Sequence, residues 1–328
     1  MTNPNALHIG PLRLPSRILL APLAGYSDLP FRSLVREQGG LGLAFTEMIR
    51  PGGLLHGREK KKQFILATDP HDVPLGWQIY GREPALMAEA ARWLEDHGAR
   101  LIDLNMGCPQ KKIAGRGAGA GLLKTPDLAV EIAEQVLKAV TVPVTAKIRL
   151  GWDAKRLVGF DLARRLADAG IAALTVHGRT AVQMYGDKAD WDAIATIAAA
   201  LPGLPVIGNG DIAAPETAVQ RLAESGCAGI MIGRGAMKNP WLIRDADRAW
   251  MGLPVLPRPV GEEARAVVLR HFDQQAAFYG TLKGALWFRK WIPLYVRPLL
   301  KMGKPEMVRL LTISGYRELR EALAALPV

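Results

Sequence analysis

A lone cysteine in a glycine-rich segment is one of two side chains in this sequence that stand out for the chemistry they can perform. Cys108 lies in Gly107-Cys108-Pro109-Gln110-Lys111-Lys112, and glycines follow at positions 115, 117, 119 and 121. A thiol becomes reactive when its surroundings shift its pKa, and alternating glycines permit a loop to open and close. The segment therefore predicts a mobile lid that carries a thiol. The alternatives are a plain flexible connector and a small buried apolar cysteine, which is how we interpret Cys227.

A lysine inside an apolar run is the second such residue. Lys147 lies in Val144-Thr145-Ala146-Lys147-Ile148, and a charged side chain there needs a buried partner. Polar or conformationally special residues end the other apolar runs at Pro22, Glu47, Gln78, Asn105, His177, Asn209 and Gly233 with Arg234. Because strand ends often meet solvent, any one of them alone carries little information. Their spacing of about one β-α unit from Glu47 onward predicts a ring of side chains at one mouth of a barrel.

Two glycine-rich turns indicate a phosphate site. Gly208-Asn209-Gly210-Asp211 and Gly233-Arg234-Gly235 supply backbone N–H groups that no side chain obstructs, and Arg234 adds a cation. In a barrel of eight β-α units, the loops after strands seven and eight form the usual phosphate site. A phosphorylated cofactor is therefore expected at these turns.

Eight short apolar runs alternate with longer helical patterns, which is typical of a parallel sheet built from β-α units. The expected strands are 17–21, 42–46, 75–79, 101–104, 142–148, 173–176, 205–207 and 229–232. Helices are expected at 85–97, 127–140, 155–169, 190–200 and 215–225. Eight strands over about 250 residues favour a closed (β/α)8 barrel, the TIM barrel of the α/β class. We place this barrel at 1–255 and a small C-terminal all-helical domain at 256–328.

Composition excludes several classes of protein. The chain has 328 residues, of which 49% are hydrophobic and 22% charged, as in ordinary globular proteins. No apolar stretch reaches the roughly 18 residues of a membrane span, and no secretory signal is expected. Two cysteines without C-x-x-C spacing argue against a zinc site or a disulfide scaffold and for the cytoplasm. We therefore expect no metal and no membrane partner.

Positive charge is concentrated near the C-terminus. The net charge of +11 favours polyanions as partners. Between positions 283 and 309 there is one acid, Glu306, and seven cations: Lys283, Arg289, Lys290, Arg297, Lys301, Lys304 and Arg309. Helical patterns at 262–278 and 283–295 place them beside Trp287, Phe288 and Trp291. RNA binding would use such a surface, although we favour a local core for the aromatics. A second basic group, Arg58 with Lys60, Lys61 and Lys62, could also touch phosphates.

Several short motifs follow one another in a familiar order between Ala21 and Trp241. They are Ala21-Pro22-Leu23-Ala24-Gly25, Asp28-Leu29-Pro30-Phe31-Arg32, Thr46-Glu47-Met48, Gln78, Asp103-Leu104-Asn105-Met106-Gly107-Cys108-Pro109, Lys147-Ile148-Arg149, Gly151-Trp152, His177-Gly178-Arg179-Thr180, Gly208-Asn209-Gly210-Asp211 and Met231-Ile232-Gly233-Arg234-Gly235. In these motifs the chain resembles the flavin-dependent tRNA-dihydrouridine synthases, and within them the bacterial DusB-like branch. The combination of the Asn-Met-Gly-Cys-Pro, Lys-x-Arg and His-Gly-Arg elements is highly specific for that family.

The resemblance implies FMN as the prosthetic group, NADPH as the reductant and tRNA as the substrate. Pro22, Leu23 and Ala24 would lie beneath the flavin ring, with Gln78 and Lys147 at its polar edge and His177 nearby. The ribityl phosphate would be held by Asn209, Gly210, Asp211, Gly233 and Arg234. Lys147 would stabilise the negative charge of the reduced ring.

The resemblance also implies a proton donor and a substrate pocket. Cys108 would give a proton to C5 of the uracil after hydride reaches C6, because a thiol of ordinary pKa about 8.5 is mostly protonated at pH 7. Asn105 and Arg179 would hold the uracil, which must first be turned out of the folded RNA. Arg289, Lys290 and Arg297 would bind tRNA. We expect a monomer.

One segment departs from the family pattern, and two other functions compete with this one. The helical domain of the family is expected to carry Arg-Lys-His followed by a Trp-Tyr pair, whereas this chain has Arg289-Lys290-Trp291-Ile292-Pro293-Leu294-Tyr295. The first competitor is a dihydroorotate-dehydrogenase-like FMN oxidoreductase that acts on a free small molecule and needs no basic appendage. The second is a non-catalytic RNA-binding protein, which would bind no flavin.

Overall fold

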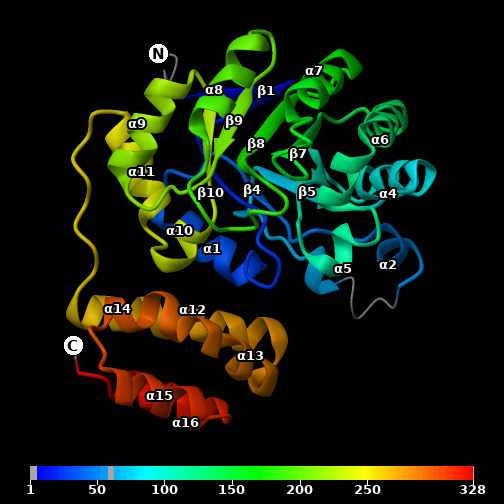
Figure 1. Ribbon diagram of the computed structural model, residues 1–328. Helices are drawn as coiled ribbons and strands as arrows, with labels where there is room; N and C mark the ends of the chain where they lie inside the picture. The colour runs from blue at the N-terminus through cyan, green and yellow to red at the C-terminus, as the bar shows by residue number, and fades with distance from the viewer. Residues whose placement is uncertain (1–5, 58–62, 328) are drawn as a thin grey trace.

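Eight parallel strands form a closed barrel at the centre of the molecule (Figure 1). The structure is a computed structural model that describes residues 6–57 and 63–327. The barrel strands are β3 (Ile18–Leu20), β4 (Ala44–Phe45), β5 (Leu75–Ile79), β6 (Ile102–Met106), β7 (Val144–Gly151), β8 (Ala173–Thr180), β9 (Val206–Asn209) and β10 (Gly229–Ile232). Their order is β3-β10-β9-β8-β7-β6-β5-β4, and a parallel bridge from Leu19 to Leu43 closes the ring. The predicted (β/α)8 barrel is therefore confirmed.

An antiparallel hairpin that the sequence did not lead us to expect precedes the barrel. Its strands are β1 (Leu7–Ile9) and β2 (Leu12–Leu14), joined by a turn in which Gly10 has a φ of 55°. Leu7, Ile9 and Leu14 belong to the same buried cluster as Leu19, Phe45, Leu101 and Met231 of the barrel. The hairpin thus adds apolar side chains to the barrel interior and contributes to the core rather than to the site.

Helices surround the barrel and bury one apolar face each against the strands. The longer ones are α1 (Leu29–Gln38), α4 (Pro84–Asp96), α6 (Pro126–Ala139), α7 (Gly159–Ala169), α8 (Trp191–Ala200), α9 (Pro215–Ser225) and α11 (Leu242–Trp250). Proline occupies the first helical position of α4, α6 and α9, where no backbone N–H is needed. Short helices follow the strand ends: α2 (Pro51–Leu55), α5 (Lys111–Ala114), the 3₁₀ helix η1 (Gly119–Lys124) and α10 (Arg234–Lys238).

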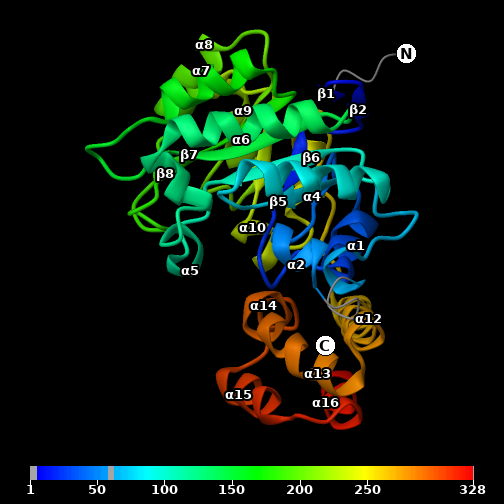
Figure 2. The ribbon, with the colours of Figure 1, turned by 90° about the vertical axis from the view of Figure 1, so that its right-hand side faces the viewer.

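A separate group of helices completes the C-terminal part of the chain (Figures 1 and 2). After an extended stretch at 253–260 come α12 (Gly261–Tyr279), α13 (Thr281–Phe288), η2 (Arg289–Trp291), the π-helical turn η3 (Ile292–Val296), α14 (Arg297–Leu299), α15 (Lys304–Thr312) and α16 (Tyr316–Ala324). In both views these helices lie against the side of the barrel that carries α1 and α10, and α12 contacts α1 while η3 contacts α10. The expected C-terminal helices are confirmed.

The C-terminal helices are tied to the barrel by buried contacts. Asp28, which caps the N-terminus of α1, accepts hydrogen bonds from Gln275 Nε2 at 3.0 Å and from the Tyr279 hydroxyl at 3.1 Å. Trp291 is fully buried and stacks on Phe31 of α1 with ring centres 4.5 Å apart. The tryptophan that departs from the family pattern therefore fills the junction between the two parts.

The described residues contain no candidate membrane span and no candidate metal site. None of the helices at 6–57 and 63–327 is long and apolar enough to cross a membrane. Within the same ranges, no cluster of three or more His, Cys, Asp or Glu side chains is arranged to hold a metal ion.

Candidate active site

A cavity of about 620 Å³ opens at the carboxyl ends of the barrel strands. The predicted site residues that line it are Pro22, Leu23, Ala24, Gln78, Asn105, Cys108, Lys147, His177, Asn209, Gly210, Asp211, Gly233 and Arg234. Strand register brings them together, since Asn105 pairs with Lys147 and His177 with Asn209 on neighbouring strands. Glu47, another predicted exit residue, instead accepts the Gly25 N–H at 2.7 Å, and Met48 lines the cavity beside it.

A buried hydrogen-bond chain holds the side chains at the ends of β5 and β6. Gln78 donates through Nε2 to Asp103 at 2.6 Å and accepts at Oε1 from Asn105 Nδ2 at 2.9 Å. Asp103 also accepts from the Thr145 hydroxyl at 2.6 Å, and burial raises the pKa of its carboxyl group. Each amide orientation is therefore fixed by its neighbour, which leaves the Gln78 side chain pre-oriented at the cavity wall.

Asn105 also determines how the chain turns toward the thiol. Its Oδ1 accepts the backbone N–H of Gly107 at 3.2 Å and of Cys108 at 2.9 Å. This is the local side-chain-to-backbone pattern by which asparagine stabilises turns. Since Asn105 also bonds Gln78, the orientation of Gln78 and the position of Cys108 depend on one side chain.

The glycine-rich segment after Cys108 is helical and packed against its surroundings, and it does not form an open lid. It forms α5 and η1, and residues 119–123 are buried. Gly119 has a φ of 56°, and a Cβ built there would lie 2.8 Å from the Cys108 carbonyl oxygen. Glycine is thus required for close packing against Cys108. The thiol is half-buried, and burial raises its pKa, so it is protonated at neutral pH.

Lys147 meets its expected partner on β9. Its Nζ donates to Asn209 Oδ1 at 2.8 Å, and Asn209 Nδ2 donates in turn to the Met231 carbonyl at 2.8 Å. Burial, with a smaller contribution from the charge of Arg149, lowers the pKa of Lys147 to about 7. An amide partner leaves the ammonium charge uncompensated, so the site favours an anionic ligand at this point.

Arg179 lies behind the cavity wall rather than on it. It is 1% exposed and donates to both oxygens of Asp211 at 2.7 Å, and to the carbonyls of Gly186 and Asp187 at 2.8 Å each. Burial would raise the pKa of Asp211, but the hydrogen bonds from Arg179 and Ala189 N–H outweigh it and the pKa is lowered. The Asp211 carboxylate is therefore ionised and engaged.

His177 is held as a neutral ring. Its Nε2 lies 3.2 Å from Arg179 NH1, which can only donate, so Nε2 accepts and the ring proton is on Nδ1. Burial, followed by the nearby charges of Lys147 and Arg149, lowers the pKa of His177 far below its usual range. The ring therefore lines the cavity as an uncharged group with one N–H.

Two further residues line the cavity without having been assigned a role from the sequence. Arg149 is 2% exposed and donates to the carbonyls of Gly107 at 2.9 Å and Met184 at 2.8 Å. Tyr185 lies with its ring 5.6 Å from the Arg149 guanidinium carbon and 4.8 Å from that of Arg234. Arg149 stands two residues after Lys147 on β7, and that period-two spacing is the signal that could have found it.

The predicted RNA-binding cations do not line the cavity. Lys290 donates to the Gly25 carbonyl and lies 3.9 Å from Asp28, with its side chain 20% exposed. Arg289 donates to the Leu311 carbonyl at 2.5 Å, within the C-terminal helices. Arg297 is exposed and its Nε lies 3.3 Å from the Met302 carbonyl. The basic group at 58–62 lies outside the described residues.

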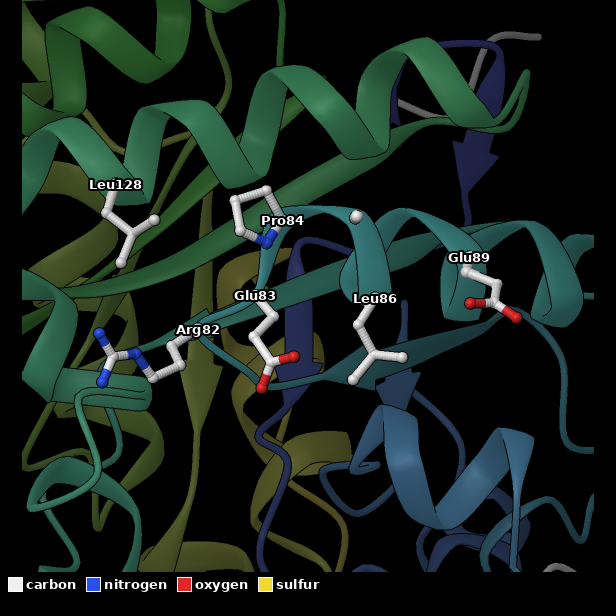
Figure 3. Close-up of a pocket in the computed structure, with 7 residues that line it drawn as sticks. Arg82, Glu83, Pro84, Leu86, Glu89 and Leu128 are labelled. Atoms are coloured by element: carbon white, nitrogen blue, oxygen red, sulfur yellow. The ribbon is translucent and has the colours of Figure 1, made fainter.

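A second hollow, of about 660 Å³, lies on the outer wall of the barrel at the start of α4 (Figure 3). It is lined by Arg82, Glu83, Pro84, Ala85, Leu86, Glu89 and Leu128. Its lining is a mixture of surface side chains and contains none of the buried polar network described above. The cavity at the strand ends is therefore the candidate active site.

A barrel of this topology with a polar cavity at its strand ends has the architecture of a (β/α)8-barrel enzyme. Residues 19–302 match the family model described as dihydrouridine synthase (Dus). The chain belongs to the dihydrouridine synthase family, whose members are oxidoreductases.

Curated bacterial relatives match almost end to end. A protein of Rhodobacter capsulatus named probable tRNA-dihydrouridine synthase is 41% identical over 91% of this chain and 91% of its own length. The tRNA-dihydrouridine synthase B of Pseudomonas aeruginosa is 40% identical over 90% of this chain and 88% of its own. That of Pasteurella multocida is 38% identical over 98% of this chain and 94% of its own.

Two solved structures share the barrel at low sequence identity. Histamine dehydrogenase from Rhizobium sp. 4-9 aligns with a TM-score of 0.57 at 14% identity over 82% of this chain. A 2-naphthoyl-CoA reductase in complex with 2-naphthoyl-CoA aligns with a TM-score of 0.54 at 13% identity over 76% of this chain. The chain spans about half the length of each of these proteins. The likeness is one of fold.

Proposed function

We propose that this protein reduces uridine to dihydrouridine in tRNA, with FMN as its prosthetic group and NADPH as its reductant. The observation that carries the proposal is that Cys108 and Lys147 open onto the same cavity in a chain of the dihydrouridine synthase family. A protonated thiol and a buried ammonium group facing one space are what the reduction of a pyrimidine ring requires.

The cavity fits FMN in size and in the chemistry of its walls. A volume of about 620 Å³ lies within the usual range of small-molecule sites. Pro22, Leu23 and Ala24 give an apolar surface for a flat ring, while Gln78 and Lys147 present polar groups at its edge. The uncompensated charge of Lys147 suits a ring that is anionic when reduced. His177, neutral and with one N–H to donate, completes the wall.

The phosphate of the cofactor fits the two glycine-rich turns. Asn209, Gly210, Asp211, Gly233 and Arg234 line this end of the cavity. A free carboxylate here would repel a phosphate, but the Asp211 side chain is bound by Arg179. The Arg234 side chain is 48% exposed and its guanidinium lies 3.5 Å from Asp211, so it can swing to the phosphate. We therefore assign Arg179 to the support of Asp211 and His177, behind the ligand.

Cys108 supplies the proton of the reaction. FMN, once bound and recharged by NADPH, would supply the hydride for C6 of the uracil. Negative charge then develops toward C5 and O4, and the Cys108 thiol donates its proton to C5. Because burial raises the thiol pKa, the proton is in place at neutral pH before the reaction begins. Asn105 holds the Cys108 turn at the cavity wall, and the uracil takes the place of the weak contact of its Nδ2 with Met48 Sδ at 3.7 Å.

tRNA provides the substrate base, and residues 256–328 form the domain that binds it. The base must be turned out of the RNA to reach a cavity at the end of a barrel, and that costs a few kcal/mol. Contacts between phosphates and the exposed cations Lys283, Arg297 and Lys301 offset the cost. The protein acts as a monomer in the cytoplasm, where its substrate occurs.

The deciding experiment compares substrates. Enzyme whose flavin has been reduced is mixed with unmodified tRNA or with free uridine, and flavin reoxidation and dihydrouridine are both measured. The proposal predicts rapid reoxidation and product only with tRNA. Equal reduction of free uridine would favour an oxidoreductase of small molecules, and a purified protein that binds no flavin even after reconstitution would favour a non-catalytic RNA-binding protein.

A further inference from the structure

Trp287 is the most exposed aromatic side chain among the described residues of the C-terminal helices. Its side chain is 40% exposed, whereas Phe272, Phe288 and Trp291 are fully buried. Leu286, the residue before it on α13, is 39% exposed. If the Trp287 ring belonged to the core of the C-terminal helices, that core would bury it, as it buries Phe272, Phe288 and Trp291. Tyr279 packs against the indole at a tilt of 47° with ring centres 4.6 Å apart, and the exposed part of Trp287 remains accessible to a ligand.

Cations surround the exposed ring. Lys283 Nζ lies 4.5 Å from the Trp287 ring centre, 5.1 Å from that of Tyr279 and 4.9 Å from that of Phe64. Lys290 Nζ lies 5.4 Å from the same indole. An aromatic face flanked by ammonium groups suits a ligand that has both a flat ring and a negative charge.

Trp287 is also close to the mouth of the active site. Lys290 Nζ lies 5.0 Å from the ring centre of Tyr26, and Tyr26 lines the cavity. Since this one nitrogen is near both rings, the two ring centres can be no farther apart than the sum of the two distances. This upper limit places Trp287 near enough to the cavity mouth to meet a base that adjoins the target uridine.

We propose that Trp287 is a stacking platform for an unpaired base next to the target uridine, with Lys283 contacting the adjoining phosphate. The proposal rests on the proposed function, because a base turned out into the cavity leaves its neighbours unstacked. An indole face that replaces the lost stacking lowers the cost of that rearrangement. Trp287 is a binding residue here and takes no part in proton or hydride transfer.

The test measures binding of unmodified, transcribed tRNA to the flavin-loaded full chain carrying W287F, W287L or the control L286A. W287L keeps apolar volume without a ring, so we expect affinity to fall roughly tenfold. W287F and L286A are expected to stay within about threefold of wild type, because the first keeps a ring and the second alters only the neighbouring apolar surface. Flavin content shows that the barrel of each variant is folded, and far-UV circular dichroism shows that its C-terminal helices are.

Salt dependence separates stacking from charge. W287L is expected to keep the wild-type slope of log affinity against log salt, whereas K283Q lowers that slope by roughly 0.7, as for one lost phosphate contact. Unchanged affinity of W287L, or equal losses in W287L and L286A, would overturn the stacking platform, and the second result would indicate an apolar surface for a protein. Failure of wild type to form dihydrouridine in tRNA would instead overturn the proposed function.

Discussion

The strand ends of the barrel and the C-terminal helices differ in how their polar side chains are held. At the strand ends, Gln78, Asp103 and Asn105 bond one another, and Arg179 is paired with Asp211. On α13 and α14, by contrast, Lys283 and Arg297 are exposed. The first region is organised before any ligand arrives, which suits chemistry that needs fixed geometry. The second offers adjustable charge, which suits a large polyanion.

The two regions meet at Asp28. Its carboxylate accepts from the N–H of Phe31 in the barrel and from Gln275 and Tyr279 in α12, and Lys290 lies 3.9 Å away. Burial raises the pKa of Asp28, while the charge of Lys290 and these hydrogen bonds act against that rise. The junction is thus as tightly bonded as the site, although it belongs to neither the cofactor nor the substrate wall.

The largest effect is expected at the thiol. Replacing Cys108 by Ala removes the proton donor, so dihydrouridine formation is expected to fall by roughly 10²- to 10⁴-fold. FMN content and NADPH oxidation are expected to stay near wild type, because the hydrogen bond of the Cys108 sulfur is with the backbone of Gln110 and not with a residue assigned to the cofactor. Product is measured in tRNA and reoxidation by flavin absorbance. Cys227→Ala serves as the control, because this thiol is buried in the core beside Gly208 of β9 and does not line the cavity. Undiminished product in the Cys108 variant would remove the thiol from the mechanism.

The next effect is expected at the junction. Asp28→Ala removes the N-cap of α1 and leaves Gln275 and Tyr279 without their acceptor, so the free energy of unfolding is expected to fall by about 2–4 kcal/mol. Denaturant unfolding measures the change, and amide hydrogen exchange in α12 shows whether that helix loosens first. Asp161→Ala is the control, because its pairs with Arg164 and Arg165 are exposed, and it is expected to cost less than about 1 kcal/mol. Similar losses in both variants would mean that Asp28 does not join the two regions.

The residues that gather at the strand ends could be predicted from the sequence, because the register of a parallel barrel leaves each strand little freedom of position. Each β-α unit returns the chain to the same mouth, so polar residues at the ends of the apolar runs gather near the cavity. Asn105 and Lys147 were placed together in this way, and the structure pairs them in register. The network through Asp103 was missed, since a polar residue inside a short apolar run gives no sign of its partners.

Other features depend on contacts that no local pattern contains. Arg179 stands two residues after His177, but a register shift between Arg149 and Gly151 and the loop at 181–189 direct it behind the wall. Glycines after Cys108 are equally compatible with a mobile lid and with the close packing that is found at Gly119. Trp291 replaces the expected histidine, and only the position of Phe31 explains why a large ring fits there.

An effect that is smaller for each pH unit, with a defined direction, is expected at Lys147. In flavin-free protein its pKa of about 7 lies below the unfolded value of 10.5, so between these pH values the unfolded chain holds a proton that the folded chain lacks. Stability of the wild type therefore rises with pH in this window, by at most about 1.4 kcal/mol per pH unit, relative to Lys147→Met. Unfolding free energies of both proteins from pH 6 to pH 10 test this. A difference that does not change with pH would show that the ammonium group is not desolvated, and the cavity would then be wetter than its walls indicate.

The smallest effect is expected at Arg297, one of the exposed cations that distinguish the C-terminal helices from the strand ends. This side chain is exposed and makes one long bond within its own segment, so Arg297→Gln is expected to leave stability within about 0.5 kcal/mol of wild type. If it contacts one phosphate, tRNA affinity falls a few-fold and the salt slope decreases by roughly 0.7 to 0.9. Arg289→Gln is the matched variant, because its guanidinium is half-buried and bound to the Leu311 carbonyl, so it is expected to lower stability instead. Equal salt slopes for wild type and Arg297→Gln would mean that the RNA approaches along another face, and the adjustable charge of α14 would then have no part in recognition.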